Sequence, residues 1–482
     1  MFLYLNIPQN NRDNGWATIV MHNWHEYGYQ ALHGQLVANP GGLAEGEKPF
    51  IYPRHRPTFL TIPYVLKELP GAAAGDGALY DGVILALLFG SVLWLMGTHT
   101  RGLLTASVLC LAPGVMSNLI NVDTISTPAL LGIAVMCFVA GTINRPTAAN
   151  GLKAITGLIL VVYMALNWSS LFSLTVLAAY LLVRQTDWKK PAIYILPAGV
   201  IGVLILAISL HGSPASGSIT GAPPPPKSDM WNAYLWGPEG YDHQGMTFAK
   251  AFVRIMAVNV IAWAPLGLVA LILWRLQGPG PRAWRAGLPL LTGIGMVFAM
   301  RNYNAHHPWG AISMIGLGVV LSLELLIRPE PQPLSRLGKW TVMGTGLGAG
   351  ILLAFWLAAN SYNNRNALPL FNLVAQHTER DALIVLAGGL LPDTNLPDDL
   401  TPFADEFDRH LVSLTTWQKN PPTKTTTAAK TYVLAHEPLD LPGLRPVATS
   451  EVASSWSDRW LAPLFDFYRQ KISRRAAGNR KV

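Results

Sequence analysis

A succession of long apolar segments, separated by short polar connectors, limits what this chain can fold into more than any other feature of its sequence. A helix needs about 20 mostly apolar residues to cross the hydrocarbon core of a bilayer. Segments of that kind recur over more than half of the chain. We therefore expect about ten transmembrane helices, at 80–98, 103–119, 127–143, 152–166, 168–183, 191–210, 255–274, 286–300, 309–327 and 340–359.

The charged residues favour the same interpretation. Only 13% of the residues are Asp, Glu, Lys or Arg, against about 25% in an average soluble domain. The net charge of +8 does not indicate nucleic-acid binding, because Lys and Arg are spread over the short connectors between apolar segments. Cys110 and Cys137 both lie inside apolar segments, so neither a disulfide framework nor a cysteine metal site is expected. The expected surroundings are membrane lipids.

Positive charge falls in alternate connectors, as it does in the cytoplasmic loops of membrane proteins. The other connectors, at 114–124, 211–250 and 301–308, are expected on the outer face, together with the regions before 80 and after 360. The positive set comprises Arg101; Arg145 and Lys153; Arg184, Lys189 and Lys190; Arg275, Arg282 and Arg285; and Arg328, Arg336 and Lys339.

Three domains are expected. Residues 1–79 form a first outer loop with interfacial helices, and residues 80–359 form the transmembrane domain, which includes an outer loop at 211–250. A chain that enters the outer face is normally preceded by a crossing helix, so we expect a first transmembrane helix to be missing upstream of residue 1; the alternative is a short N-terminus that is itself translocated. Residues 360–482 are expected to form a soluble outer-face α/β domain.

Within that last domain, the apolar runs 381–387 and 431–435 predict short buried strands. Helices are expected near 366–378, 401–412 and 456–473. The predicted fold class is thus a polytopic α-helical membrane protein with a small C-terminal α/β domain.

The residues that can carry chemistry gather in the regions expected on the outer face. Asp13 and Asp123 each suit a helix N-cap, because Asp before a helix accepts backbone N–H bonds. Arg54 and Arg56 suit contacts with lipid headgroups. The adjacent His306 and His307 resemble a metal pair, but neighbouring side chains on a helix point about 100° apart, so no metal site is assigned.

Taken together, these stretches resemble the GT-C glycosyltransferases, specifically the bacterial relatives of dolichyl-phosphate-mannose–protein mannosyltransferases and the aminoarabinose lipid A transferases. In that family an acidic residue opens the first outer loop, followed by an aromatic-Ala pair and a Gly; Asp13, Trp16-Ala17 and Gly28 stand in this pattern. Further similar stretches are Arg56 to Leu60, Pro113 with Asp123, and Arg301 to Trp309. The chain departs from the family at Asn14, where an acidic residue is common.

The resemblance implies that the chain transfers a sugar from a polyprenyl-phosphate donor to an acceptor hydroxyl at the outer face of a bacterial inner membrane. It makes Asp13 the expected catalytic base, because a carboxylate can deprotonate the attacking hydroxyl. Asp123 is expected to orient the acceptor or that base. The expected substrate-binding residues are Arg54, His55, Arg56, Lys250, Arg254, Arg301, Tyr303 and His306.

Several alternatives stay open at the level of sequence. One is a non-catalytic membrane subunit or scaffold, and another is a transporter or flippase, which the near absence of charge inside the apolar segments disfavours. The donor sugar is not identified, and the acceptor can be a protein, a lipid or a polysaccharide. No cofactor is assigned, and use of a divalent metal stays open because the superfamily contains metal-using and metal-free members.

Overall fold

The computed structural model describes residues 12–39, 41–43, 58–67, 78–120, 126–166, 170–185, 187–211, 247–306, 308–328, 344, 348, 377–379, 382–386, 410–413, 418, 431–434 and 445–446. The chain divides into two compact units. The first comprises Met1–Leu5, Trp24–Val37 and Phe50–Leu353, and the second comprises Asn6–Asn23, Ala38–Pro49 and Ala354–Val482.

The described elements are mostly helices. They are α1 (Arg12–Tyr27), α2 (Thr58–Lys67), α3 (Ala78–Met96), α4 (Thr100–Leu111), α5 (Pro113–Ile120), α6 (Ser126–Ile143), α7 (Asn150–Leu166), α8 (Ser170–Arg184), α9 (Lys189–His211), α12 (Phe248–Gln277), η1 (Ala283–Arg285), α13 (Gly287–Ala299), α14 (Arg301–His306) and α15 (Pro308–Leu326).

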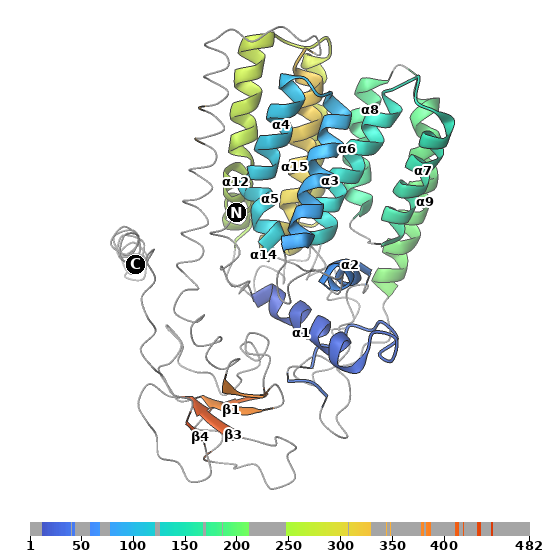
Figure 1. Cartoon of the computed structure of the whole chain (residues 1–482). Helices are drawn as coiled ribbons and strands as arrows, with labels where there is room; N and C mark the ends of the chain where they lie inside the picture. The colour runs from blue at the N-terminus through green and yellow to red at the C-terminus, as the bar shows by residue number, and fades with distance from the viewer. Residues whose placement is uncertain are drawn as a thin grey trace, which may run out of the picture. The chain divides into compact units, whose positions relative to one another are not determined.

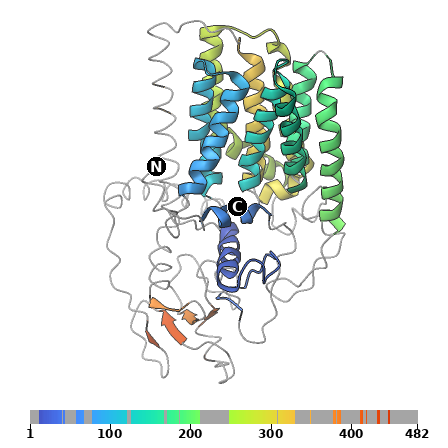
Figure 2. The same cartoon turned by 45° about the vertical axis from the view of Figure 1, so that its right-hand side comes forward.

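In the first unit the long helices run side by side as a bundle around α15 (Figure 1, Figure 2). Helix α15 packs against α6, α8, α12 and α13, and α3 packs against α4 and α6. The core is apolar; Leu317, Val320 and Leu321 of α15 are fully buried. Large apolar side chains also cover the surface of the bundle, including Ile193 on α9 and Val253 on α12. An apolar exterior of this extent suits lipid and not water.

The predicted transmembrane segments agree closely with the described helices, apart from 103–119, which is divided, and 340–359, of which only residues 344 and 348 are described. Over the part of the chain that the structure describes, α12 is long and apolar enough to cross a membrane, and shorter apolar helices of 10–17 residues accompany it. The bundle has a polytopic helical architecture, as the sequence predicted.

The segment predicted as one helix at 103–119 is instead two helices, α4 and α5. Ala112 between them has an extended backbone (φ −63°, ψ 139°). Pro113 explains the break, because proline disfavours helical geometry in the residue before it and is well suited to the first position of a new helix.

Helices α13 and α15 approach backbone to backbone. A Cβ atom at Gly293 of α13 would lie 2.7 Å from Met314 O, and one at Gly318 of α15 would lie 2.9 Å from Pro289 O. Small residues permit this close approach, which is a common way for helices to associate in membranes. The two helices are therefore held by shape as well as by apolar contact.

The second unit contains a parallel sheet with strand order β2-β1-β3-β4, formed by β1 (Leu383–Leu386), β2 (His410–Ser413), β3 (Thr431–Leu434) and β4 (Arg445–Pro446). Leu383 pairs with His410 on one side and with Thr431 on the other. The strands predicted at 381–387 and 431–435 are confirmed. The helix predicted at 401–412 is wrong at residues 410–412, where pairing with β1 produces strand β2.

Candidate functional site

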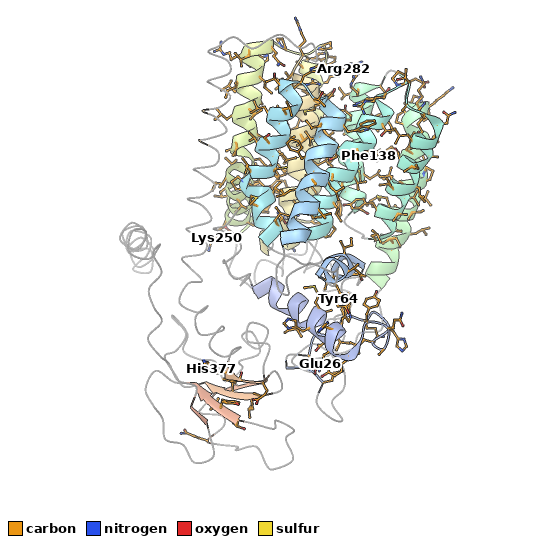
Figure 3. All side chains as sticks on the ribbon, viewed as in Figure 1. Glu26, Tyr64, Phe138, Lys250, Arg282 and His377 are labelled. Atoms are coloured by element: carbon orange, nitrogen blue, oxygen red, sulfur yellow. The ribbon has the colours of Figure 1, made fainter. Side chains whose placement is uncertain are left out.

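The first unit has two distinct ends. We call one the α14 end: α5, α14 and the beginnings of α12 and α15 meet there, since each of α12 and α15 packs on both α5 and α14. We call the other the Arg101 end, where α4 begins and α12 and α15 terminate. Lys250 and Arg282 lie near these opposite ends (Figure 3). Two of the predicted substrate-binding residues, Lys250 and Arg301, belong to the α14 end.

At the α14 end, the cationic side chain of Arg301 lies beside an aromatic strip. The guanidinium carbon of Arg301 is 5.4 Å from the centroid of the Phe248 ring. Phe248 and Phe252 are one turn apart on α12, with ring centroids 6.4 Å apart, and Phe252 stacks on Phe298 of α13 at 5.2 Å. Phe248 and Phe252 keep 49% and 42% of their surfaces exposed. The strip thus presents aromatic faces next to positive charge.

Lys250 is placed by the way α12 begins. The hydroxyl oxygen of Thr247 accepts a hydrogen bond from the Lys250 backbone N–H at 3.3 Å and caps the helix. The Lys250 side chain is exposed in the first turn. The N-terminus of a helix carries partial positive charge, so α12 adds to the field of Lys250 and Arg301. This arrangement suits an anion that also carries an apolar chain.

Buried asparagines line the interior towards the same end. Asn118, Asn259 and Asn304 are at most 3% exposed. Each donates its side-chain amide to a backbone carbonyl: Asn118 to Gly114 O at 2.7 Å, Asn259 to Ile255 O at 2.8 Å and Asn304 to Val297 O at 2.8 Å. Their side-chain oxygens have no hydrogen-bond partner within the described residues. These three buried side-chain oxygens are therefore able to accept further hydrogen bonds.

A polar cluster ties the helices together at the Arg101 end. The carboxylate of the buried Glu324 accepts a hydrogen bond from the Tyr180 hydroxyl at 2.9 Å and lies 3.5 Å from Arg184 Nε. Asn144 donates to the Tyr180 oxygen at 2.6 Å. The guanidinium of Arg101 donates to the carbonyls of Met96, Glu324 and Ile327. We call these residues the Glu324 cluster; it joins α3, α4, α6, α8 and α15.

Arg145 makes further polar contacts at the Arg101 end. Its guanidinium donates to Trp94 O at 2.6 Å and lies 3.5 Å from the centroid of the Trp94 ring. Burial lowers the pKa of Arg145 from its usual value, but arginine stays charged in proteins. The contacts of Arg101, Arg145 and Arg184 therefore bring three of the positively charged connectors to one end of the bundle.

Gly28 has a structural role at the end of α1. Its backbone has φ +88°, and its N–H donates to Trp24 O at 3.0 Å. A glycine with positive φ commonly terminates a helix. The chain then turns so that the rings of Trp24, Tyr29 and Tyr64 pack together, with Trp24 and Tyr29 at 5.0 Å and Trp24 and Tyr64 at 5.5 Å. Gly28 therefore fixes where the helix that bears Asp13 ends.

The structure brings together only part of the predicted site. Lys250 and Arg301 lie on adjacent helices, and α12 and α14 also carry Arg254, Tyr303 and His306, whose side chains are outside the described set. Asp13 lies in the first turn of α1, again without a described side chain. The residues outside the described ranges are Arg54, His55, Arg56 and Asp123. Their roles stay predictions.

Sequence analysis missed Asn118 and Asn259. The sequence did contain a signal for Asn259, because this residue interrupts an apolar segment, where a polar side chain is costly and usually functional. No group of three or more His, Cys, Asp or Glu side chains suited to a metal ion occurs among the described residues.

Comparison with protein-family models and with curated proteins finds no match. Among solved structures, the crystal structure of ArnT from Cupriavidus metallidurans bound to undecaprenyl phosphate is similar, with a TM-score of 0.50 and 12% sequence identity. The similarity covers 85% of this chain and 83% of that chain. At this sequence identity, the similarity shows a shared fold and nothing more specific. The resemblance in fold that the sequence predicted is confirmed: the chain has a polytopic helical fold similar to that of this ArnT structure.

Proposed function

We propose that this chain is a membrane glycosyltransferase that moves a sugar from a polyprenyl-phosphate donor to an acceptor hydroxyl, and that the donor binds at the α14 end. The observation that carries the proposal is the packing of Arg301 against the exposed strip of Phe248 and Phe252, with the exposed Lys250 in the same first turn of α12. The similar ArnT structure holds undecaprenyl phosphate, which is a ligand of the same chemical class.

In this proposal the cations bind the phosphate group of the donor. Charge-assisted hydrogen bonds from arginine and lysine bind phosphate oxygens strongly. The bond from the phosphate oxygen to the anomeric carbon breaks during transfer, so negative charge grows on that oxygen. In the proposed site Arg301 and Lys250 stabilise this charge, which is the usual way in which an enzyme lowers such a barrier.

The lipid-facing side of α12 accounts for the prenyl chain. Phe248 and Phe252 continue along the helix into Val253, Val260 and Ile261, all more than 40% exposed. A prenyl chain can lie along this apolar surface and remain in the hydrocarbon phase, while its phosphate stays at the end of the helix. Burial of apolar surface contributes about 25 cal/mol per Å².

In this proposal the buried asparagines bind the hydroxyl groups of the sugar. The side-chain oxygens of Asn118, Asn259 and Asn304 need hydrogen-bond donors, and sugar hydroxyls supply them. A site that pairs with substrate hydroxyls discriminates well against analogues that lack them, because its own polar groups are then left unpaired.

The chemical step needs a base. In the proposed reaction Asp13 takes the proton of the acceptor hydroxyl, whose oxygen forms the new bond to the anomeric carbon as the phosphate leaves. Asp123 orients the acceptor or Asp13, and the remaining donor contacts come from Arg54, His55, Arg56, Arg254, Tyr303 and His306. We place this site and the C-terminal domain at the outer face of a bacterial inner membrane. These assignments rest on the sequence resemblance.

The test is sugar transfer from a pool of radiolabelled polyprenyl-phosphate sugars, in membranes that carry the wild type or Asp13→Asn at matched expression. Loss of a general base lowers the rate by roughly 10²- to 10⁴-fold. Asp187→Asn is the matched control, because the Asp187 carboxylate is exposed and caps α9 by accepting from Lys189 N at 3.1 Å, a role that Asn also fills.

We expect label to reach an acceptor in the wild type and in Asp187→Asn, but not in Asp13→Asn. Transfer from no donor would instead favour a non-catalytic membrane subunit. Equal transfer by wild type and Asp13→Asn would remove Asp13 from the role of base.

A further inference from the structure

We propose that the Arg101 end carries a binding site for one anionic phospholipid, and we call it the Trp284 patch. The site is independent of the proposed glycosyltransferase activity, since Arg282 and Lys250 lie near opposite ends of the bundle (Figure 3). The patch comprises Arg282, Trp284 and Arg285 in the connector that contains η1, Trp188 in the connector between α8 and α9, and Lys189 and Lys190 in the first turn of α9.

The two connectors adjoin the same turn of α15. Helices α8 and α13 pack against each other, and the last residue of α8, Arg184, pairs with Glu324 of α15. The connector after α12 is fixed to the same helix end, because Gly280 N donates to Leu326 O at 2.7 Å. The end of α8 and the beginning of α13 are therefore neighbours, and each brings its cations to this place.

Three of the four cations of the patch, Lys189, Lys190 and Arg285, are exposed, and Arg282 is half-buried. Trp284 is 74% exposed, and the guanidinium carbon of Arg285 lies 3.9 Å from its ring centroid. The ring holds the arginine in place and leaves its N–H donors for a phosphate. An exposed indole beside a basic side chain is typical of the membrane–water interface.

Little negative charge opposes these cations. In the described connectors and helix ends at the Arg101 end, the carboxylates are those of Asp187 and Glu324. Asp187 accepts from the backbone of Lys189 at 3.1 Å, and Glu324 is buried against Tyr180 and Arg184. The patch keeps a net positive charge, which fits the phosphate of an anionic headgroup.

Apolar surface adjoins the patch on the two packed helices. Leu182 on α8 is 67% exposed, and Leu291 on α13 is 66% exposed, with Leu288 between Leu291 and η1. An acyl chain can lie along these side chains while its headgroup reaches the arginines. The combination of cations, interfacial tryptophans and an apolar strip selects a phospholipid over a soluble phosphate.

The test compares the affinity of phosphatidylglycerol with that of phosphatidylcholine of the same acyl chains, measured by native mass spectrometry on the purified full chain in detergent. Each basic side chain near a membrane surface contributes roughly a fivefold factor in affinity for anionic lipid. We expect wild type to prefer phosphatidylglycerol and Arg282→Gln/Arg285→Gln to lose about 25-fold of that affinity. The charge-preserving variant Arg282→Lys/Arg285→Lys keeps most of it.

The matched control is Lys153→Gln/Arg275→Gln, which removes the same charge at the same end from two residues outside the patch, the half-buried Lys153 and the exposed Arg275; its affinity stays within about twofold. Equal binding of the two lipids by wild type would overturn the proposal, as would equal losses in the Gln variant and this control. The last measurement is the binding of soluble glycerol phosphate. If it binds as tightly as phosphatidylglycerol, the patch is an anion site and not a lipid site.

Discussion

Asparagine residues are the points at which packing and proposed chemistry meet in this protein. Asn259 lies on the buried face of α12, and its amide is tied to Ile255 O, so its side-chain oxygen is held in place without a partner among the described residues. Such an oxygen costs about 1–3 kcal/mol if it stays unpaired. A residue that costs stability and stays buried is best explained by a ligand.

Replacement of Asn259 by leucine separates these two effects. Leucine removes the buried acceptor, so the free energy of unfolding stays within about 1 kcal/mol of the wild-type value or rises. Sugar transfer falls by roughly three- to tenfold, the value of one neutral hydrogen bond. Thermal unfolding and the transfer assay, run on the same preparations, measure the two quantities.

The control for this prediction is Thr292→Leu, because Thr292 makes a similar bond to Leu288 O at 2.9 Å but is not buried. It changes neither quantity. A large loss of stability in Asn259→Leu would show that the amide is structural, and unchanged transfer would remove it from the sugar site.

At the scale of elements, the bundle is fixed by polar contacts at one end and by close packing in its middle. The Glu324 cluster joins five helices at the Arg101 end, with each oxygen of the Glu324 carboxylate facing a donor. The α14 end is built differently, with cations, aromatic rings and unpaired amide oxygens. This asymmetry fits the proposed enzyme, which would work at one membrane surface, whereas transporters hold their polar sites near the midplane.

The contact between α13 and α15 gives a test of the packing. Gly293→Leu would place side-chain atoms against the backbone of α15, because even a Cβ there lies 2.7 Å from Met314 O. Overpacking of this kind costs about 1–3 kcal/mol or more. Gly295→Leu is the matched control, since a Cβ there meets nothing within 4 Å.

We expect a lower unfolding temperature for Gly293→Leu and a wild-type value, within about 0.5 kcal/mol, for Gly295→Leu. Equal effects of the two variants would mean that helix propensity, and not the α13–α15 contact, determines the result.

For the whole molecule, the sequence predicted the helices far better than it predicted the site. Apolar length alone places α3, α6 and α9, because a bilayer demands long apolar runs. The same criterion wrongly predicted α4 and α5 as one helix, although Pro113 indicates the break between them. Residues 410–412 were wrongly predicted as helix because the pairing that makes them a strand, with Leu383 and its neighbours, is distant in sequence.

The site was only partly predictable for a similar reason. Arg301 lies beside the Phe248 ring because α12 packs on α14, and no sequence spacing reveals that contact. Local sequence identifies which residues carry charge, but the packing of helices decides which of them share a ligand. The same holds for Asn118 and Asn259, which belong to helices separated by more than 120 positions in the chain.

The most direct test of the central claim is the equilibrium binding of a fluorescent polyprenyl phosphate to the purified chain. Lys250→Gln/Arg301→Gln is compared with Lys153→Gln/Arg275→Gln, which removes the same charge at the opposite end. If the donor phosphate binds at the α14 end, the first variant loses at least tenfold in affinity, as expected when charge-assisted hydrogen bonds of about 1.5–3 kcal/mol are lost, while the second stays near wild type. Equal affinities in the two variants would contradict a donor site built on Lys250 and Arg301.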